Sequence, residues 1–114
     1  MMSKTTRIEK RKYPRIVVTG MGIDVSDGIG CWSGTVSDVS RNGLCVSDLG
    51  LVLGKKTNTY TVVASKGLSH FKFRVKPRWE VVRARSKTMG VEISETPGKW
   101  VEYVQNLESV ISKG

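Results

Sequence analysis

Several kinds of residue are scarce in this sequence of 114 residues, and each scarcity excludes a class of protein. There are two cysteines, Cys31 and Cys45, and one histidine, His70. The cysteines have no CxxC spacing and stand far from the histidine along the chain, so too few ligands are available for a zinc site. No apolar stretch approaches the roughly 20 residues that a membrane-spanning helix needs, which argues against membrane insertion.

The N-terminus and the polar residues give further exclusions. The first 15 residues carry positive charge with no apolar segment behind them. They do not fit a signal peptide, so we expect a cytoplasmic protein. His70 has no cysteine or serine at a spacing that would mark a nucleophile, and the glycine-rich segment 19–30 lacks the GK[ST] ending of a phosphate-binding P-loop. We therefore expect that the protein is not an enzyme and has no metal and no cofactor.

Positive charge is what the sequence has in excess. Its 19 lysines and arginines stand against 10 aspartates and glutamates, for a formal net charge of +9. The basic residues gather in residues 1–15 and again in residues 72–87. Such an excess indicates an anionic partner, which could be nucleic acid, a nucleotide or a membrane surface. A solvated tail and ordinary strand surfaces would explain the same charges without any partner.

Short apolar and β-branched runs predict an all-β domain. Phe71, Phe73 and Val75 alternate with basic residues, as in a strand with one face in the core, and Pro77 should interrupt that strand with a bulge or an edge. An Asn-Gly turn signal joins two of the runs into a hairpin. The glycine-rich segment 20–30 is expected to be a turn or an irregular connection. The predicted strands are residues 15–18, 31–40, 43–48, 57–64, 70–84 and 88–93.

The hydrophobic period changes near the C-terminus. Apolar residues recur there at spacings of four, three and four, in Trp100, Val104, Leu107 and Ile111. This spacing predicts an amphipathic helix over about residues 97–112, with its apolar stripe packed on the sheet of the same chain. Strands followed by one helix, without an internal repeat, indicate a single domain that closes into a barrel or sandwich.

Two arginines stand four positions apart just before the first predicted strand, in the stretch RKYPR. Pro14 disfavours helical geometry there, so Arg11 and Arg15 do not share a helix face. Guanidinium groups on an extended segment suit phosphate oxygens or the acceptor edge of a guanine, because arginine binds both with two hydrogen bonds.

A second motif, DVSRNG, lies at the tip of the predicted hairpin. Asp38 and Ser40 are two positions apart on a strand and therefore project from the same side. A carboxylate can accept hydrogen bonds from the N1–H and N2–H edge of guanine, and Gly43 permits a sharp backbone turn. On its own, this motif is typical of an ordinary turn.

Taken together, RxxxR before the first strand and DxSxxG one strand later resemble the signature of the PilZ domain, the bacterial receptor module for cyclic di-GMP (c-di-GMP). Trp79 followed by GVEI at residues 90–93 is similar to the late-strand pattern of that family, and the C-terminal helix fits as well. The resemblance implies a six-stranded antiparallel β-barrel over residues 11–114, capped at one end by the helix. A flexible basic tail of residues 1–10 precedes it.

The resemblance also implies which residues bind the ligand. They are Arg11, Arg15, Asp38, Ser40 and Gly43. The two arginines would bind the phosphates and the guanine faces, and the three hairpin residues would read a guanine. Lys10 occupies a position thought in the family to influence whether one ligand or a stacked pair binds, and a basic residue there favours a pair. Arg41 is a candidate for an extra phosphate contact.

The function implied is a switch, in which cyclic di-GMP orders the N-terminal segment and a separate effector protein recognises the changed surface. The chain would act as a monomer or weak dimer in the control of motility, adhesion or polysaccharide secretion, without binding DNA or RNA. Two alternatives stay open. A small basic barrel could bind single-stranded nucleic acid through its aromatic residues, or a PilZ-like adaptor could bind proteins without the nucleotide. The aromatic residues are Trp32, Tyr60, Phe71, Phe73 and Trp79.

Overall fold

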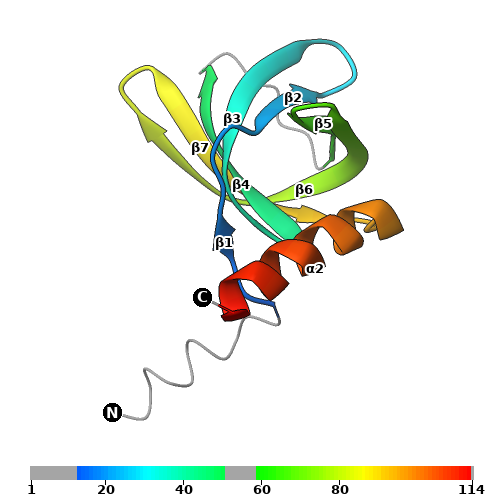
Figure 1. Ribbon diagram of the computed structural model, residues 1–114. Coiled ribbons are helices and arrows are strands. Elements are labelled where there is room, and N and C mark those ends of the chain that lie inside the picture. The colour runs from blue at the N-terminus through cyan, green and yellow to red at the C-terminus, as the bar shows by residue number, and fades with distance from the viewer. Residues whose placement is uncertain (1–12, 51–58, 114) are drawn as a thin grey trace.

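The computed structural model describes residues 13–50 and 59–113, which form seven strands and one helix (Figure 1). The elements are β1 (Ile16–Val17), β2 (Gly22–Ser26), β3 (Cys31–Ser40), β4 (Gly43–Gly50), β5 (Tyr60–Lys66), β6 (Ser69–Arg83), β7 (Ser86–Ile93) and α2 (Gly98–Lys113). Lys10, Arg11 and the basic tail expected for residues 1–10 lie outside the described residues. The strands agree with the predicted ranges to within a few residues, with the exception of β2.

Six of the strands form a closed barrel in which neighbouring strands are antiparallel. The order around the ring is β3, β2, β5, β6, β7 and β4, and the pairing of β4 with β3 closes it. Strand β1 lies outside this ring and pairs with the end of β3. Helix α2 lies across one end of the barrel (Figure 1). The expected six-stranded barrel with a C-terminal helix is therefore confirmed.

The prediction was wrong for the first half of the glycine-rich segment 20–30, which contains β2. Ile23 and Val25 are buried in the core, whereas Asp24 between them is exposed. Only two apolar residues carry this alternation, and the glycines on either side concealed it. The second half is a turn as expected, because the Asp27 carboxylate accepts hydrogen bonds at 2.8 Å from two of the backbone amides that follow it.

Strand β6 alternates as predicted. Phe71, Phe73 and Val75 are buried, and the basic residues between them are exposed. The register of β6 against β7 shifts between Pro77 and Trp79, so the interruption expected at Pro77 is confirmed as a bulge. Beyond this bulge, the hairpin of β6 and β7 extends away from α2 with its β6 residues exposed (Figure 1). One strand thus contributes both to the core and to a charged outer surface.

Helix α2 is held to the barrel by a buried tryptophan. Trp100 is fully buried, and its ring packs edge-on against Phe71 and Phe73, with 5.2 Å between ring centroids in each pair. Its indole Nε1 donates a hydrogen bond of 3.1 Å to the backbone carbonyl of Ser40. The predicted apolar stripe ends before Ile111, which is 57% exposed. The first turns of the helix therefore cover the barrel and the last turn does not.

Replacing Trp100 by alanine should destabilise the fold strongly, because the change removes a fully buried ring and its hydrogen bond to Ser40. We expect the free energy of unfolding to fall by about 3–5 kcal/mol, the usual cost of truncating a buried aromatic side chain. Urea denaturation followed by circular dichroism measures it. Val110→Ala, on the same helix at a side chain that is 69% exposed, is the control and should cost less than about 0.5 kcal/mol. Equal losses in both variants would show that Trp100 does not anchor α2.

Candidate functional site

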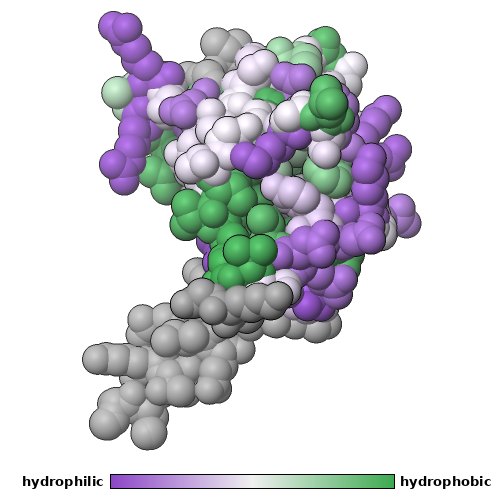
Figure 2. Space-filling model, viewed as in Figure 1, coloured by the Kyte–Doolittle hydropathy of each residue, from purple (hydrophilic) through white to green (hydrophobic). Residues whose placement is uncertain are grey.

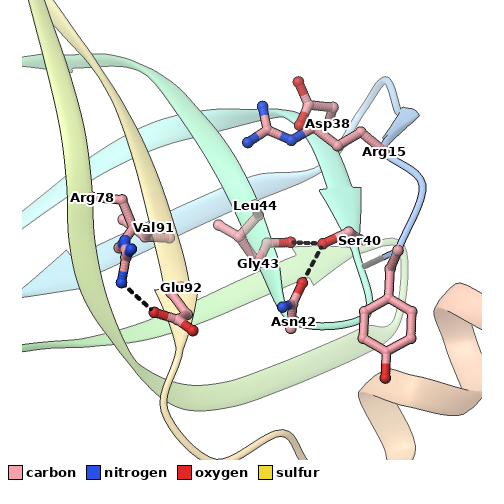
Figure 3. Close-up of a pocket in the computed structure, with 10 residues that line it drawn as sticks. Arg15, Asp38, Ser40, Asn42, Gly43, Leu44, Arg78, Val91 and Glu92 are labelled. Atoms are coloured by element: carbon pink, nitrogen blue, oxygen red, sulfur yellow. Dashed lines mark hydrogen bonds and ion pairs between the residues drawn. The ribbon is translucent and has the colours of Figure 1, made fainter. Parts of the chain in front are cut away.

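The candidate ligand-binding residues Arg15, Asp38, Ser40 and Gly43 line one pocket of about 340 Å³ at the surface of the barrel. The pocket lies between the tip of the β3–β4 hairpin, strand β7 and the chain that leads into β1 (Figure 3). Its lining residues are Tyr13, Arg15, Asp38, Ser40, Asn42, Gly43, Leu44, Arg78, Val91 and Glu92.

The pairing of β1 with β3 brings the two motifs together. Arg15 directly precedes β1, and Val17 of β1 stands opposite Asp38 of β3. Ser40 follows Asp38 by two residues, so both side chains face the same side of the strand. Figure 3 shows the side chain of Arg15 lying beside that of Asp38. Two distant parts of the sequence therefore present a cation, an anion and a hydroxyl group to one pocket.

Ser40 is held in position by the turn that follows it. The residue is 7% exposed, and its hydroxyl donates a hydrogen bond of 3.0 Å to Asn42 Oδ1 (Figure 3). The same hydroxyl lies 3.5 Å from the carbonyl oxygen of Gly43. Its backbone carbonyl accepts the hydrogen bond from Trp100 described above. The position of Ser40 is thus fixed by the packed helix as well as by the hairpin.

Gly43 is required for a different reason from the one that the sequence suggested. The two residues of the hairpin turn are Arg41 and Asn42, and Gly43 is already the first residue of β4, opposite Ser40. It is not among the described glycines with positive φ. A Cβ atom at Gly43 would lie 2.6 Å from the carbonyl oxygen of Val91. The glycine therefore permits close approach of β7 at the floor of the pocket.

Arg41 lies outside the residues that line the pocket. Its guanidinium faces α2, where Nη2 donates to Glu108 Oε1 at 2.7 Å and Nε donates to Glu108 Oε2 at 3.1 Å. These hydrogen bonds to Glu108 raise the pKa of Arg41. The same guanidinium lies 5.1 Å from the centre of the Tyr13 ring. Arg41 thus connects the hairpin tip with α2 and with the segment that enters β1.

Sequence reasoning missed a second charged pair in the pocket. Arg78 of β6 donates from Nη1 to Glu92 Oε1 of β7 at 2.8 Å, and both residues line the pocket (Figure 3). Their side chains are 65% and 45% exposed. Arg78 lies in the bulge after Pro77, and bulges commonly redirect a side chain. The proline signalled that bulge, but only the pairing of β6 with β7 reveals which pocket Arg78 lines.

Charges of opposite sign, on Asp38 and Arg15, act on the thiol of Cys45 near the pocket. Cys45 of β4 stands opposite Asp38 of β3. Burial raises the pKa of the Cys45 thiol and the negative charge of Asp38 raises it further, whereas a hydrogen bond with Ser37 and the positive charge of Arg15 lower it. The net shift is upward, so Cys45 remains a thiol at neutral pH. Asp38 and Arg15 thus bring charges of opposite sign to this side of the pocket.

The described part of the chain shows neither a cluster of metal-ligating side chains nor a helix suited to span a membrane. Residues 13–50 and 59–113 contain no group of three histidine, cysteine, aspartate or glutamate side chains arranged to hold a metal ion. Within the same ranges, no helix combines the length and the apolar character that crossing a bilayer requires.

The fold resembles that of several solved structures of PilZ-domain proteins. The inhibitor of motility MotI/DgrA from Bacillus subtilis superposes with a TM-score of 0.72 at 12% sequence identity, over 92% of this chain and 53% of that one. PlzA from Borreliella burgdorferi, in complex with c-di-GMP, gives a TM-score of 0.70 at 16% identity, over 99% of this chain and 58% of that one. The PilZ domain of YcgR from Escherichia coli, with c-di-GMP, gives a TM-score of 0.63 at 11% identity, over 91% of this chain and 92% of that one.

These comparisons define a PilZ-like fold, which confirms at the level of fold the resemblance read from the sequence. The sequence itself matches no protein-family model and no curated protein. The chain spans between half and three fifths of the length of MotI/DgrA and PlzA, at 53% and 58%. The similarity therefore concerns only part of each of those two proteins.

Replacing Gly43 by alanine should distort the pocket, because the new Cβ would collide with the Val91 carbonyl oxygen at 2.6 Å. We expect a loss of about 1–3 kcal/mol in unfolding free energy, which is typical of overpacking. Gly98→Ala is the matched control, because a Cβ atom there meets nothing within 4 Å, and it should leave stability unchanged or slightly higher. Thermal denaturation compares the two. A Gly43→Ala variant as stable as Gly98→Ala would contradict the close packing of β7 against the hairpin.

Proposed function

We propose that this protein is a receptor for cyclic di-GMP and binds it in the pocket between the β3–β4 hairpin, β7 and the chain before β1. The observation that carries the proposal is that Arg15, Asp38, Ser40 and Gly43 line a single pocket in a PilZ-like fold. These residues come from two motifs that are separate in the sequence. The PlzA and YcgR structures that share the fold contain c-di-GMP.

The chemistry of the pocket supports specific roles for its side chains. Arg15 would bind a phosphate or stack on a guanine face, and Asp38 would accept hydrogen bonds from the N1–H and N2–H edge of a guanine. Arg78 offers a second guanidinium from the β6–β7 side of the pocket. In this proposal Arg11 is a second motif arginine, and Lys10 influences the number of ligand molecules bound.

The relay of the signal is proposed to begin where the N-terminal segment meets the hairpin. Tyr13, Arg41 and Glu108 link that segment, the hairpin tip and α2. Two anionic phosphates would draw the basic N-terminal residues onto the barrel, with charge-assisted hydrogen bonds offsetting the entropy lost on ordering. A separate effector protein would then recognise the altered surface. We place this switch in the cytoplasm, without catalysis, and regard control of motility as its output.

The nucleic-acid alternative receives less support from the positions of the aromatic side chains. Tyr60, Phe71 and Phe73 are buried in the core, and Trp32 is half-buried. Trp79 is the most exposed of the five at 39%. Single-stranded nucleic acid requires exposed rings on which bases can stack. The adaptor alternative, which needs no nucleotide, would leave the charged pocket without a role.

Isothermal titration calorimetry with cyclic di-GMP at physiological salt tests the proposal. We expect saturable binding by the wild type, much weaker binding of cyclic di-AMP, and an affinity at least about thirtyfold lower for Arg15→Ala, which corresponds to about 2 kcal/mol. Arg83→Ala removes an exposed arginine near the end of β6, far from the pocket lining, and should bind like the wild type. Absence of binding by the wild type, or equal affinities of the two variants, would refute the site.

Replacing Asp38 by alanine should reduce the preference of the protein for cyclic di-GMP over cyclic di-AMP, because the carboxylate is proposed to contact the guanine base. The ratio of the dissociation constants of cyclic di-AMP and cyclic di-GMP should fall by at least about tenfold, given the cost of an unpaired base edge. Asp24→Ala is the matched control. Asp24 of β2 is exposed, and its carboxylate accepts a hydrogen bond from the hydroxyl of Ser33, on another part of β3. An unchanged ratio in Asp38→Ala would exclude Asp38 from base recognition.

Alanine variants of Arg78 and Arg41 should differ in their effects on cyclic di-GMP binding. Arg78→Ala should weaken cyclic di-GMP binding by about tenfold, because it removes a charge-assisted contact and leaves Glu92 unpaired beside an anionic ligand. Arg41→Ala should weaken binding by less than about threefold, because Arg41 bonds to Glu108 and lies outside the pocket lining. The same calorimetric titration measures both. A larger loss in Arg41→Ala would instead identify Arg41 as the extra phosphate contact.

A further inference from the structure

A groove of about 1,090 Å³, separate from the pocket at the β3–β4 hairpin, lies on the outer surface of the barrel beside the start of α2. It is bounded by the outer face of β6, the start of β5 and the segment 94–97 that connects β7 with α2. The backbone amide of Ser94 donates a hydrogen bond of 2.9 Å to the carbonyl of Arg74, which holds that segment against β6. The groove shares none of its lining residues with the pocket at the β3–β4 hairpin.

One side of this groove is strongly basic. Lys72, Arg74 and Lys76 line it from β6, and all three are exposed. Among the residues that the structure describes, none of the three has an ion-pair partner, whereas Arg78 further along the strand is paired with Glu92. Glu95 is the acidic residue in the lining. Figure 2 shows hydrophilic side chains gathered on the side of the molecule where β6 meets the start of α2.

The spacing of these charges suits an extended chain. Lys72, Arg74 and Lys76 occupy every second position of β6, and two strand residues span about 6.6 Å. An extended peptide has the same repeat, so its alternate side chains could each meet one cation. Thr61 stands opposite Arg74 on β5 and also lines the groove, so its hydroxyl adds a hydrogen-bonding group. The first turn of α2 contains no acidic residue to neutralise the positive end of its dipole.

We propose that this groove, formed by Lys72, Arg74 and Lys76 with segment 94–97, docks an acidic, extended segment of a partner protein. A concave surface suits a chain better than a flat membrane. Phe73 is the aromatic residue in the lining and it is buried, so the groove offers no ring on which nucleic-acid bases can stack. Its volume exceeds the range of about 300–1,000 Å³ that is typical of small-molecule pockets.

The groove and the hairpin pocket are connected through β6, which gives the docking surface a place in the proposed switch. Glu92 stands opposite Lys76 in the strand register and forms the ion pair with Arg78 in the pocket. A phosphate that attracts Arg78 would free Glu92 to approach Lys76 and would thereby change the charge of the groove. This coupling rests on the proposed function, whereas the docking of an acidic segment does not.

The docking proposal is tested by fluorescence anisotropy with the full chain and a short labelled peptide that carries glutamate at every second position. The double variant Lys72→Glu/Lys76→Glu should bind this peptide at least about tenfold more weakly than the wild type. Arg83→Glu/Arg85→Glu is the matched control, because it makes the same change in net charge at exposed residues around the β6–β7 turn. It should lose less than about twofold in affinity. Lys72→Gln/Lys76→Gln gives a milder variant in case the charge reversal disturbs folding.

Two outcomes would overturn the proposal. Equal losses in the groove variant and the control would mean that the peptide senses only net charge. Binding of an oligothymidine that is tighter than that of the peptide, and lost in the groove variant, would identify nucleic acid as the occupant. The peptide is titrated without nucleotide, so failure of wild-type cyclic di-GMP binding in calorimetry would not alter this result. Conversely, a groove variant that still binds cyclic di-GMP would separate the two sites.

Discussion

The antiparallel pairing of β3 with β4 closes the barrel, and both the core and the candidate site depend on it. The closure brings the hairpin tip to the end of the barrel, where the carbonyl of Ser40 accepts the hydrogen bond from Trp100. The same hairpin carries Asp38 on the strand that β1 joins, so Arg15 is placed beside it. At this end of β3, beyond the residues that pair with β2, the strand is paired with β1 on one side and with β4 on the other. A rigid scaffold thus holds the side chains that are proposed to meet the ligand.

Strand β6 serves two purposes because its side chains alternate. Its inner residues pack around Trp100, and its outer residues supply the cations of the proposed docking groove. The bulge after Pro77 ends this regular alternation and brings Arg78 to the other pocket. Neighbouring positions on one strand therefore line the two different surfaces that are proposed to bind. Such proximity offers a short physical route by which one anion could influence the binding of another.

The sequence was sufficient to predict the elements whose pattern is local. It was insufficient to predict contacts that depend on the pairing of distant segments. The alternation around Phe73 and the helical spacing around Trp100 predicted their elements and their burial correctly. Strand β2 was missed because glycines flank a short alternation. Arg78 was missed because its place beside the hairpin follows from the pairing of β6 with β7, and the ion pair between Arg41 and Glu108 joins residues far apart in the chain. Such contacts leave no pattern in a single sequence.

The central claim is that cyclic di-GMP binds at the β3–β4 hairpin, and nuclear magnetic resonance with amide-labelled protein tests it most directly. Titration should shift the backbone amide signals of Asp38, Ser40 and Gly43 first and most strongly. The amides of Lys72 and Arg74, in the separate groove, should change little by comparison. Shifts centred on Lys72, Arg74 and segment 94–97, or no shifts at saturating nucleotide, would contradict the account.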